Sequence, residues 1–207
     1  MSSMFDLTGC VSLVSGAASG MGKAVALAVA EAGSDIVLAD INEAGAHAVA
    51  QEIEALGRKV LPVVCDISSP EAIRAMFTQI DETFGRIDFV ANIAGEAVRK
   101  KPEVIELDEV EWTWRNIVYG RFCICQEAGK RMLEQGRGSI INLGSLASIT
   151  ALGRGHIAYS MAMGAVVQMT RELSTEWSGR GVRVNSVLPA QVLNPGLQQR
   201  RDADPRI

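Results

Sequence analysis

A glycine-rich segment follows the first short apolar run of the chain and has the character of a phosphate-binding turn. Residues 10–15 have the pattern of a buried strand and residues 23–30 that of a helix, so the segment joins a strand to a helix start. Glycines there let the backbone turn sharply and bring its N–H groups close to an anion, which the helix macrodipole also favours. The expected phosphate contacts are Gly16, Ser19, Gly20, Met21 and Gly22.

An acidic residue closes the second predicted strand. Asp40 lies 20 residues after Gly20, where a carboxylate can reach the adenosine ribose of a dinucleotide. The strand, turn, helix, strand and acid together predict a dinucleotide-binding unit. The simpler alternative is a tight turn followed by an ordinary acid at a strand end.

Short apolar runs alternate with helical segments along nearly the whole chain, and these elements must position the turn and the acid. Strands are expected at residues 10–15, 35–40, 59–65, 87–92, 139–145 and 182–188. Their nearly continuous apolar character is typical of parallel strands buried on both faces. Six strands with helical crossovers predict one α/β domain over residues 1–207, built on a doubly wound parallel sheet.

Capping residues mark where the crossover helices begin and end. Asn42 and Ser69 are typical helix caps, and Gly57 and Gly85 are typical stops. Longer helices are expected over residues 108–136 and 159–179. Pro62 lies inside the third predicted strand and removes a backbone donor, which favours the outer edge of the sheet for this strand.

The composition excludes several classes of protein. With 20 Lys and Arg against 24 Asp and Glu, the chain lacks the basic excess of a nucleic-acid binder. It has no apolar run of about 20 residues and no signal-like start, so we expect no membrane partner and a cytoplasmic location. The cysteines lack the spacing of a zinc site and are expected to be buried, reduced thiols. They are Cys10, Cys65, Cys123 and Cys125.

The glycine spacing Gly16-x3-Gly20-x-Gly22 differs from the GxGxxG of the general dinucleotide fold and resembles that of the short-chain dehydrogenase/reductase family. The likeness spans about residues 7–195. Its other motifs are Asp66 after the third strand, Asn92-Ile93-Ala94-Gly95, Asn116, Ser145, Tyr159-Ser160-Met161-Ala162-Met163 and residues 182–189. The resemblance implies a three-layer Rossmann-type fold and hydride transfer between a nicotinamide cofactor and a secondary alcohol or ketone.

The resemblance also assigns roles to individual residues. Tyr159 would exchange a proton with the substrate oxygen, Ser145 would hold that oxygen, and Asn116 would help to position a water relay. Cofactor contacts beyond the turn are implied at Asp40, Ile41, Asp66, Ile67, Asn92, Ala94, Gly95, Pro189 and Val192. Asn194 occupies the place of a family threonine that meets the cofactor amide, and it can still donate and accept hydrogen bonds.

Charge at the ribose site predicts the cofactor. The Asp40 carboxylate accepts hydrogen bonds from a ribose diol and repels a 2′-phosphate, and Ile41 stands where an arginine would accept that phosphate. NAD(H) is therefore expected in preference to NADP(H).

One position departs from the family pattern. The family has a lysine one helical turn after the tyrosine, and this chain has Met163. A tyrosine, with an unperturbed pKa near ~10, is a poor base at neutral pH unless a nearby cation favours its anion. The protein is then either an oxidoreductase with weakened activity or a non-catalytic nucleotide-binding or assembly subunit. Arg154 and His156, in the loop before the tyrosine, are candidates for the missing charge; the alternative is that they are ordinary loop residues.

The resemblance further implies a homodimer or homotetramer, because the helices near residues 108–136 and 159–179 commonly form family interfaces. An apolar set on the second helix is interpreted as structural packing. Its members are Met163, Val166, Val167, Met169 and Leu173. The family continues into a substrate lid and a final strand, so the chain is expected to be C-terminally incomplete, or the sheet edge at residues 182–188 is covered by a partner.

Overall fold

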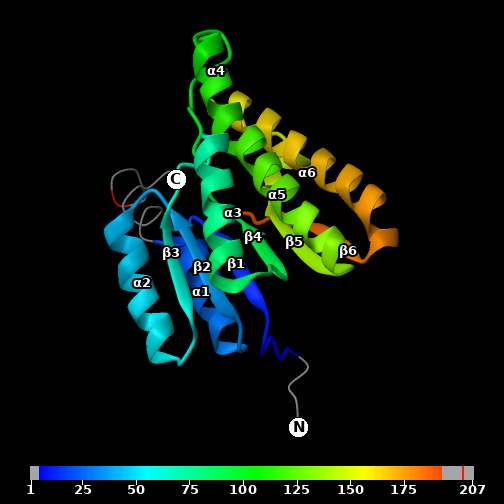
Figure 1. The fold of residues 1–207 in the computed structure, drawn as a ribbon. Coiled ribbons are helices and arrows are strands. Elements are labelled where there is room, and N and C mark those ends of the chain that lie inside the picture. The colour runs from blue at the N-terminus through cyan, green and yellow to red at the C-terminus, as the bar shows by residue number, and fades with distance from the viewer. Residues whose placement is uncertain (1–4, 193–201, 203–207) are drawn as a thin grey trace.

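The computed structural model describes residues 5–192 and residue 202, and within them six parallel strands form one sheet. The strand order is β3-β2-β1-β4-β5-β6. The strands are β1 (Val11–Ser15), β2 (Asp35–Asp40), β3 (Val60–Val64), β4 (Phe89–Asn92), β5 (Gly138–Leu143) and β6 (Val182–Val187). This arrangement confirms the predicted doubly wound α/β fold, and Figure 1 shows the twist of the sheet.

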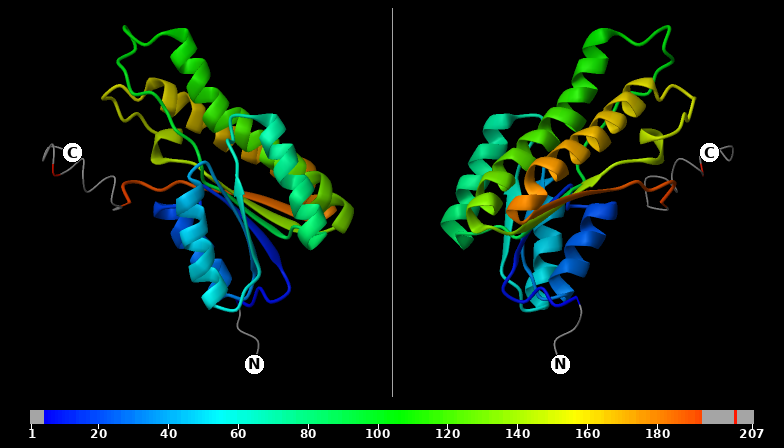
Figure 2. Two further views of the ribbon diagram at one scale, coloured as in Figure 1. Left: turned by 60° about the vertical axis from the view of Figure 1, so that its left-hand side comes forward. Right: turned by 90° about the vertical axis from the view of Figure 1, so that its right-hand side faces the viewer.

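Helices cover both faces of the sheet, as the views in Figure 2 show. The helices are α1 (Gly20–Glu31), α2 (Glu43–Ala55), α3 (Pro70–Phe84), α4 (Leu107–Trp114), α5 (Gly120–Gln135) and α6 (Ile157–Trp177). One apolar core joins the sheet to α1 and α2, and a second joins it to α3, α5 and the end of α6. The chain is thus a three-layer structure.

The ends of the elements follow the predicted capping residues. The side chains of Asn42 and Ser69 accept hydrogen bonds from backbone N–H groups in the first turns of α2 and α3. Gly85 and Gly136 adopt left-handed conformations at the ends of α3 and α5. Pro62 lies in β3, which is at the edge of the sheet as predicted.

The predicted helix over residues 108–136 differs from the observed one in its middle. Between α4 and α5 the chain forms a π-helical turn, η1 (Arg115–Tyr119), so the helix contains one wide turn. Two short 3-10 segments also occur, η2 (Leu146–Ser148) after β5 and η3 (Ser178–Arg180) after α6. Such π-turns are frequent at functional sites.

The four cysteines are free, and three of them are buried, in agreement with a packing role for Cys123 and Cys125. In the described part of the chain, no helix combines the length and apolarity that crossing a membrane requires. Within the same residues, no three or more His, Cys, Asp or Glu side chains gather as a metal site would need. Asn194, the predicted contact to the cofactor amide, lies outside the described residues, as do residues 197–201 and 203–207, on which the prediction about the chain end depends.

Candidate active site

The glycine-rich turn leaves the carboxyl end of β1 and enters α1. Gly16 and Gly20 have φ values of +72° and +53°, in the region that favours glycine. Gly22 is needed for a different reason: a Cβ built there would lie 1.9 Å from the Gly16 carbonyl oxygen. The turn and the first helical turn are therefore in direct backbone contact.

The start of α1 differs from the starts of α2 and α3. The side chain of the α1 N-cap residue, Ser19, makes no capping hydrogen bond, whereas Asn42 and Ser69 cap the other two helices. The first N–H groups of α1 thus stay available, with the positive end of the helix dipole behind them. This arrangement fits a bound pyrophosphate.

The acid at the end of β2 faces this turn. The Asp40 carboxylate accepts hydrogen bonds from the backbone N–H groups of Ala18 and Asn42, both at 2.9 Å. A carboxylate has about four acceptor sites, so Asp40 can also accept from hydroxyl groups. Ile41 beside it is 68% exposed and Met21 is half-buried.

The two cofactor contacts predicted after β3, Asp66 and Ile67, differ in exposure. Asp66 is exposed and accepts a hydrogen bond from the Ser68 N–H at 2.8 Å, so its carboxylate is accessible to a ligand. Ile67 is buried in the core, and its carbonyl lies where a Cβ on Gly120 would be only 2.1 Å away.

A buried polar network holds the loop after β4. The Ser15 hydroxyl accepts hydrogen bonds from the N–H groups of Ile93 and Ala94 at 2.9 and 3.1 Å. The fully buried Asn92 side chain donates to the Arg121 carbonyl and to Asn142. Asn92 therefore positions the loop through internal hydrogen bonds, while Gly95 at its end is exposed and has φ +146°.

Ser145 follows β5 and caps η2. Its side chain is buried, and its hydroxyl oxygen accepts a hydrogen bond from the Ala147 N–H at 3.2 Å. The hydroxyl hydrogen has no acceptor among the described residues, so it can donate to a ligand. Pro189 lies two residues after β6, and its carbonyl accepts a hydrogen bond from the Leu146 N–H, which joins the loop containing Val192 to this segment.

Asn116 lies in the π-turn η1. Its side-chain amide donates to the Trp112 carbonyl at 3.0 Å, one turn earlier, which leaves the amide oxygen available. The turn packs against α6 through Ile117, which shares a small apolar cluster with Ala162, Met163 and Val166.

Tyr159 lies in the first turn of α6 and is half-buried against the same apolar cluster. Its ring meets the His156 ring edge-on, with centroids 6.2 Å apart. Since α6 packs on both η1 and η2, the structure places Tyr159, Ser145 and Asn116 on three adjoining segments beside the carboxyl ends of β4 and β5.

Met163 is 4% exposed, one turn after Tyr159, and its sulfur lies 3.9 Å from a guanidinium nitrogen of Arg121. Arg121 is 1% exposed, the largest of the fully buried side chains in the described residues. The sequence interpretation missed it, although helical spacing puts Arg121 on the same face as Ile117, Ile124 and Cys125, all of them buried. An arginine among apolar residues on one helix face is the sequence pattern that could have indicated a buried charge at this position.

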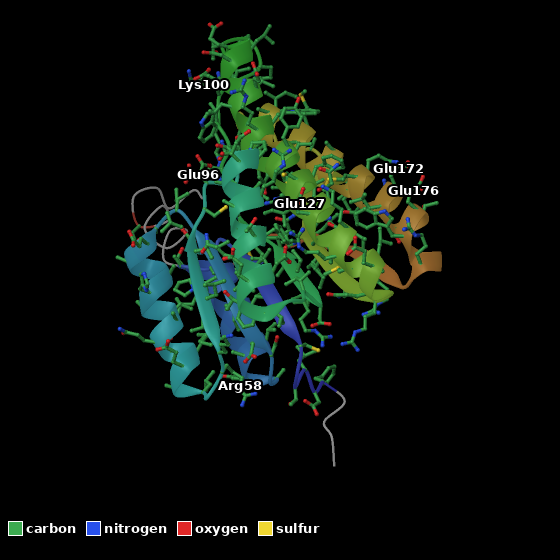
Figure 3. The ribbon with its side chains drawn as sticks, in the orientation of Figure 1. Arg58, Glu96, Lys100, Glu127, Glu172 and Glu176 are labelled. Carbon is green, nitrogen blue, oxygen red and sulfur yellow. The ribbon has the colours of Figure 1, made fainter. Side chains whose placement is uncertain are left out.

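The two loop residues considered as alternative cations, Arg154 and His156, differ in whether they contact Tyr159. Arg154 is exposed, with φ +56°, whereas His156 contacts the Tyr159 ring and hydrogen-bonds the Gly153 carbonyl at 2.7 Å. Lys100 lies beside α4 in Figure 3 and is paired with Glu109. Of these groups, His156 alone contacts Tyr159.

The fold and the glycine-rich turn define a dinucleotide-binding α/β protein, and comparison with known proteins is more specific. A family model described as enoyl-(acyl carrier protein) reductase matches residues 16–206. The chain is 40% identical to D-threitol dehydrogenase of Mycolicibacterium smegmatis over 189 residues, covering 91% of this chain and 72% of the relative. It is 37% identical to NAD-dependent glycerol dehydrogenase of Listeria innocua, covering 91% and 73%.

Solved structures agree with this result. A short-chain type dehydrogenase/reductase from Mycobacterium marinum superimposes with a TM-score of 0.86 at 34% identity, covering 90% of this chain and 76% of the other. The chain belongs to the short-chain dehydrogenase/reductase family. The two curated relatives are named as dehydrogenases of D-threitol and of glycerol, and the second is named as NAD-dependent.

Proposed function

We propose that this protein transfers hydride between NAD(H) and a secondary alcohol or ketone. The observation that carries the proposal is the convergence of the glycine-rich turn, Ser145, Asn116 and Tyr159 at the carboxyl ends of β1, β4 and β5. In the order β3-β2-β1-β4-β5-β6, the chain reverses its direction across the sheet between β1 and β4, where α/β proteins bind ligands.

The residues present fit a dinucleotide. The uncapped start of α1 would hold the pyrophosphate, Asp40 the adenosine ribose, and Asp66 the adenine. The Asp40 carboxylate would disfavour a ribose 2′-phosphate, which supports NAD(H) over NADP(H). When bound, the nicotinamide supplies the hydride acceptor for oxidation and the hydride donor for reduction.

The protein side chains would manage the substrate oxygen and its proton. Tyr159 accepts the hydroxyl proton when an alcohol is oxidised and returns it when a ketone is reduced. Ser145 donates its unused hydroxyl hydrogen to the same oxygen, which holds it and stabilises negative charge there. The free amide oxygen of Asn116 would hold a water that carries protons to solvent.

The two tyrosines of the chain provide a matched test. NADH formation would be measured with NAD and a panel of D-threitol, glycerol and further secondary alcohols, chosen because two relatives bear those names. Tyr159→Phe should lower kcat by at least about 100-fold. Tyr119→Phe, at a side chain that is 54% exposed, should leave kcat unchanged. Equal rates for both variants would contradict the proposed role of Tyr159.

A second candidate function, a non-catalytic nucleotide-binding subunit, is favoured by one observation. Met163 is buried and uncharged where the family pattern has a lysine. If the protein binds NADH but turns over no substrate of the panel, before or after Met163→Lys, this second function holds and the oxidoreductase proposal fails. The cytoplasmic location and the homo-oligomer stay predictions.

A further inference from the structure

Arg121 is a buried cation that lacks a carboxylate partner in the described part of the chain, where no acidic oxygen lies within 4.0 Å of it. Its Nε donates to the Ala94 carbonyl at 3.1 Å, and Nη2 donates to the carbonyls of Ile93 and Ala94 at 3.0 Å each. Nη1 donates to the Leu143 carbonyl and contacts the Met163 sulfur. Every N–H is satisfied, yet the net charge stays uncompensated.

Burying an ion without an opposite charge beside it costs free energy, so the place where the fold holds this guanidinium calls for an explanation. Its carbonyl partners belong to the loop after β4 and to the end of β5, two residues before Ser145. Gly95 leaves room for it, since a Cβ there would be 3.3 Å from Nη2. The guanidinium therefore lies among the segments that carry the proposed reaction.

We propose that Arg121 supplies from α5 the positive charge that a lysine at position 163 would supply from α6, and that this charge favours the anionic form of the Tyr159 oxygen. The inference rests on the proposed function and makes Arg121 a positioning residue for Tyr159. It also accounts for Met163, because a lysine there would bring a second cation against the buried guanidinium.

The electrostatics agree with this geometry. Burial lowers the pKa of Arg121 to about 10, and its interactions with Tyr159 and Cys125 act in the opposite direction. The guanidinium thus stays charged at neutral pH.

The remaining charged groups around Tyr159 come from two neighbouring segments. His156 faces its ring from the loop before α6, and Lys100, bridged to that loop through its backbone, is paired with Glu109. The test must therefore separate Arg121 from His156.

Tyrosinate absorbance provides a test that needs no substrate. In a Tyr119→Phe background, Tyr159 is the only tyrosine of the full chain, so the pH at half-maximal tyrosinate absorbance reports on that residue. Into this background we would introduce Arg121→Lys and Arg121→Gln. Both shorten the side chain and disturb the same carbonyl contacts, but only lysine can carry a positive charge.

The expected result is a midpoint about one to three pH units higher in the Gln variant than in the Lys variant. Circular dichroism would show whether the Gln variant folds. If it does not, a second pair of variants gives the same comparison. Arg121→Met combined with Met163→Lys should restore the parent midpoint, whereas Arg121→Met combined with Met163→Gln should not. His156→Gln serves as the control and should change the midpoint by less than Arg121→Gln does.

Equal midpoints within either folded pair would overturn the role of Arg121. This outcome is distinct from failure of the proposed function, because the titration does not depend on turnover. A shifted midpoint in a protein without activity would keep the inference and reject the oxidoreductase. Turnover with unshifted midpoints would keep the oxidoreductase function and reject the role of Arg121.

Discussion

Gly22→Ala should damage the nucleotide site by a backbone collision. The added Cβ would lie 1.9 Å from the Gly16 carbonyl oxygen and 2.5 Å from its carbon, and ordinary contact begins near 3.4 Å. The turn or the start of α1 must therefore move by about 1.5 Å. Overpacking of this kind costs about 1–3 kcal/mol, and a displacement of about 1 Å at a binding site can cost about 100-fold.

We expect the variant to unfold in urea with a free energy reduced by about 1–3 kcal/mol and to bind NADH at least about tenfold more weakly. NADH affinity would be measured by fluorescence titration. Gly179→Ala is the matched control: its Cβ meets no atom within 4 Å, so stability should be equal or slightly higher and NADH affinity unchanged. Parent-like NADH affinity in Gly22→Ala would refute the assignment of this turn to the cofactor.

Three further predictions follow from the electrostatics. Asp40→Asn should lower the preference for NADH over NADPH, measured as the ratio of dissociation constants, by at least about tenfold, because the repulsion of a 2′-phosphate is removed; an unchanged ratio would contradict this. For Glu127, burial raises the pKa, but hydrogen bonds from Lys130 and Arg131 outweigh it and lower the pKa overall. Its ion pairs thus stabilise the fold above the unfolded pKa and are lost as pH falls through the folded value. Glu127→Gln should cost about 1–2 kcal/mol at pH 7 in urea unfolding. This cost should shrink progressively as pH falls through the lowered folded pKa; a pH-independent difference would refute the sign. Burial raises the pKa of Cys125 to about 11, so a maleimide at pH 7 should label it only after unfolding, and rapid labelling of the native protein would count against the buried site.

The fold was largely predictable because parallel strands leave a strong signature. The strand at Asp35–Asp40 matches the prediction at both ends, and Pro62 indicated which strand lies at the edge. The π-turn at η1 was not predictable, since its extra residue depends on how α4 and α5 pack against α6 rather than on local periodicity.

Family motifs in the sequence predict candidate site residues, but they do not predict contacts that form only on folding. Tyr159 and Ser145 stand at family positions, so the resemblance identified them. Arg121 contacts carbonyls 22 to 28 positions away in the chain, and such contacts exist only after folding. The sequence therefore showed that a charge was missing at Met163 but not where another charge lies.

The most direct test of the proposed function is NADH formation by the parent protein and by Tyr159→Phe over a range of pH, with saturating NAD and the most active alcohol of the panel. We expect turnover in the parent and a loss of at least about 100-fold in the variant at each pH. A variant as active as the parent at every pH would contradict it.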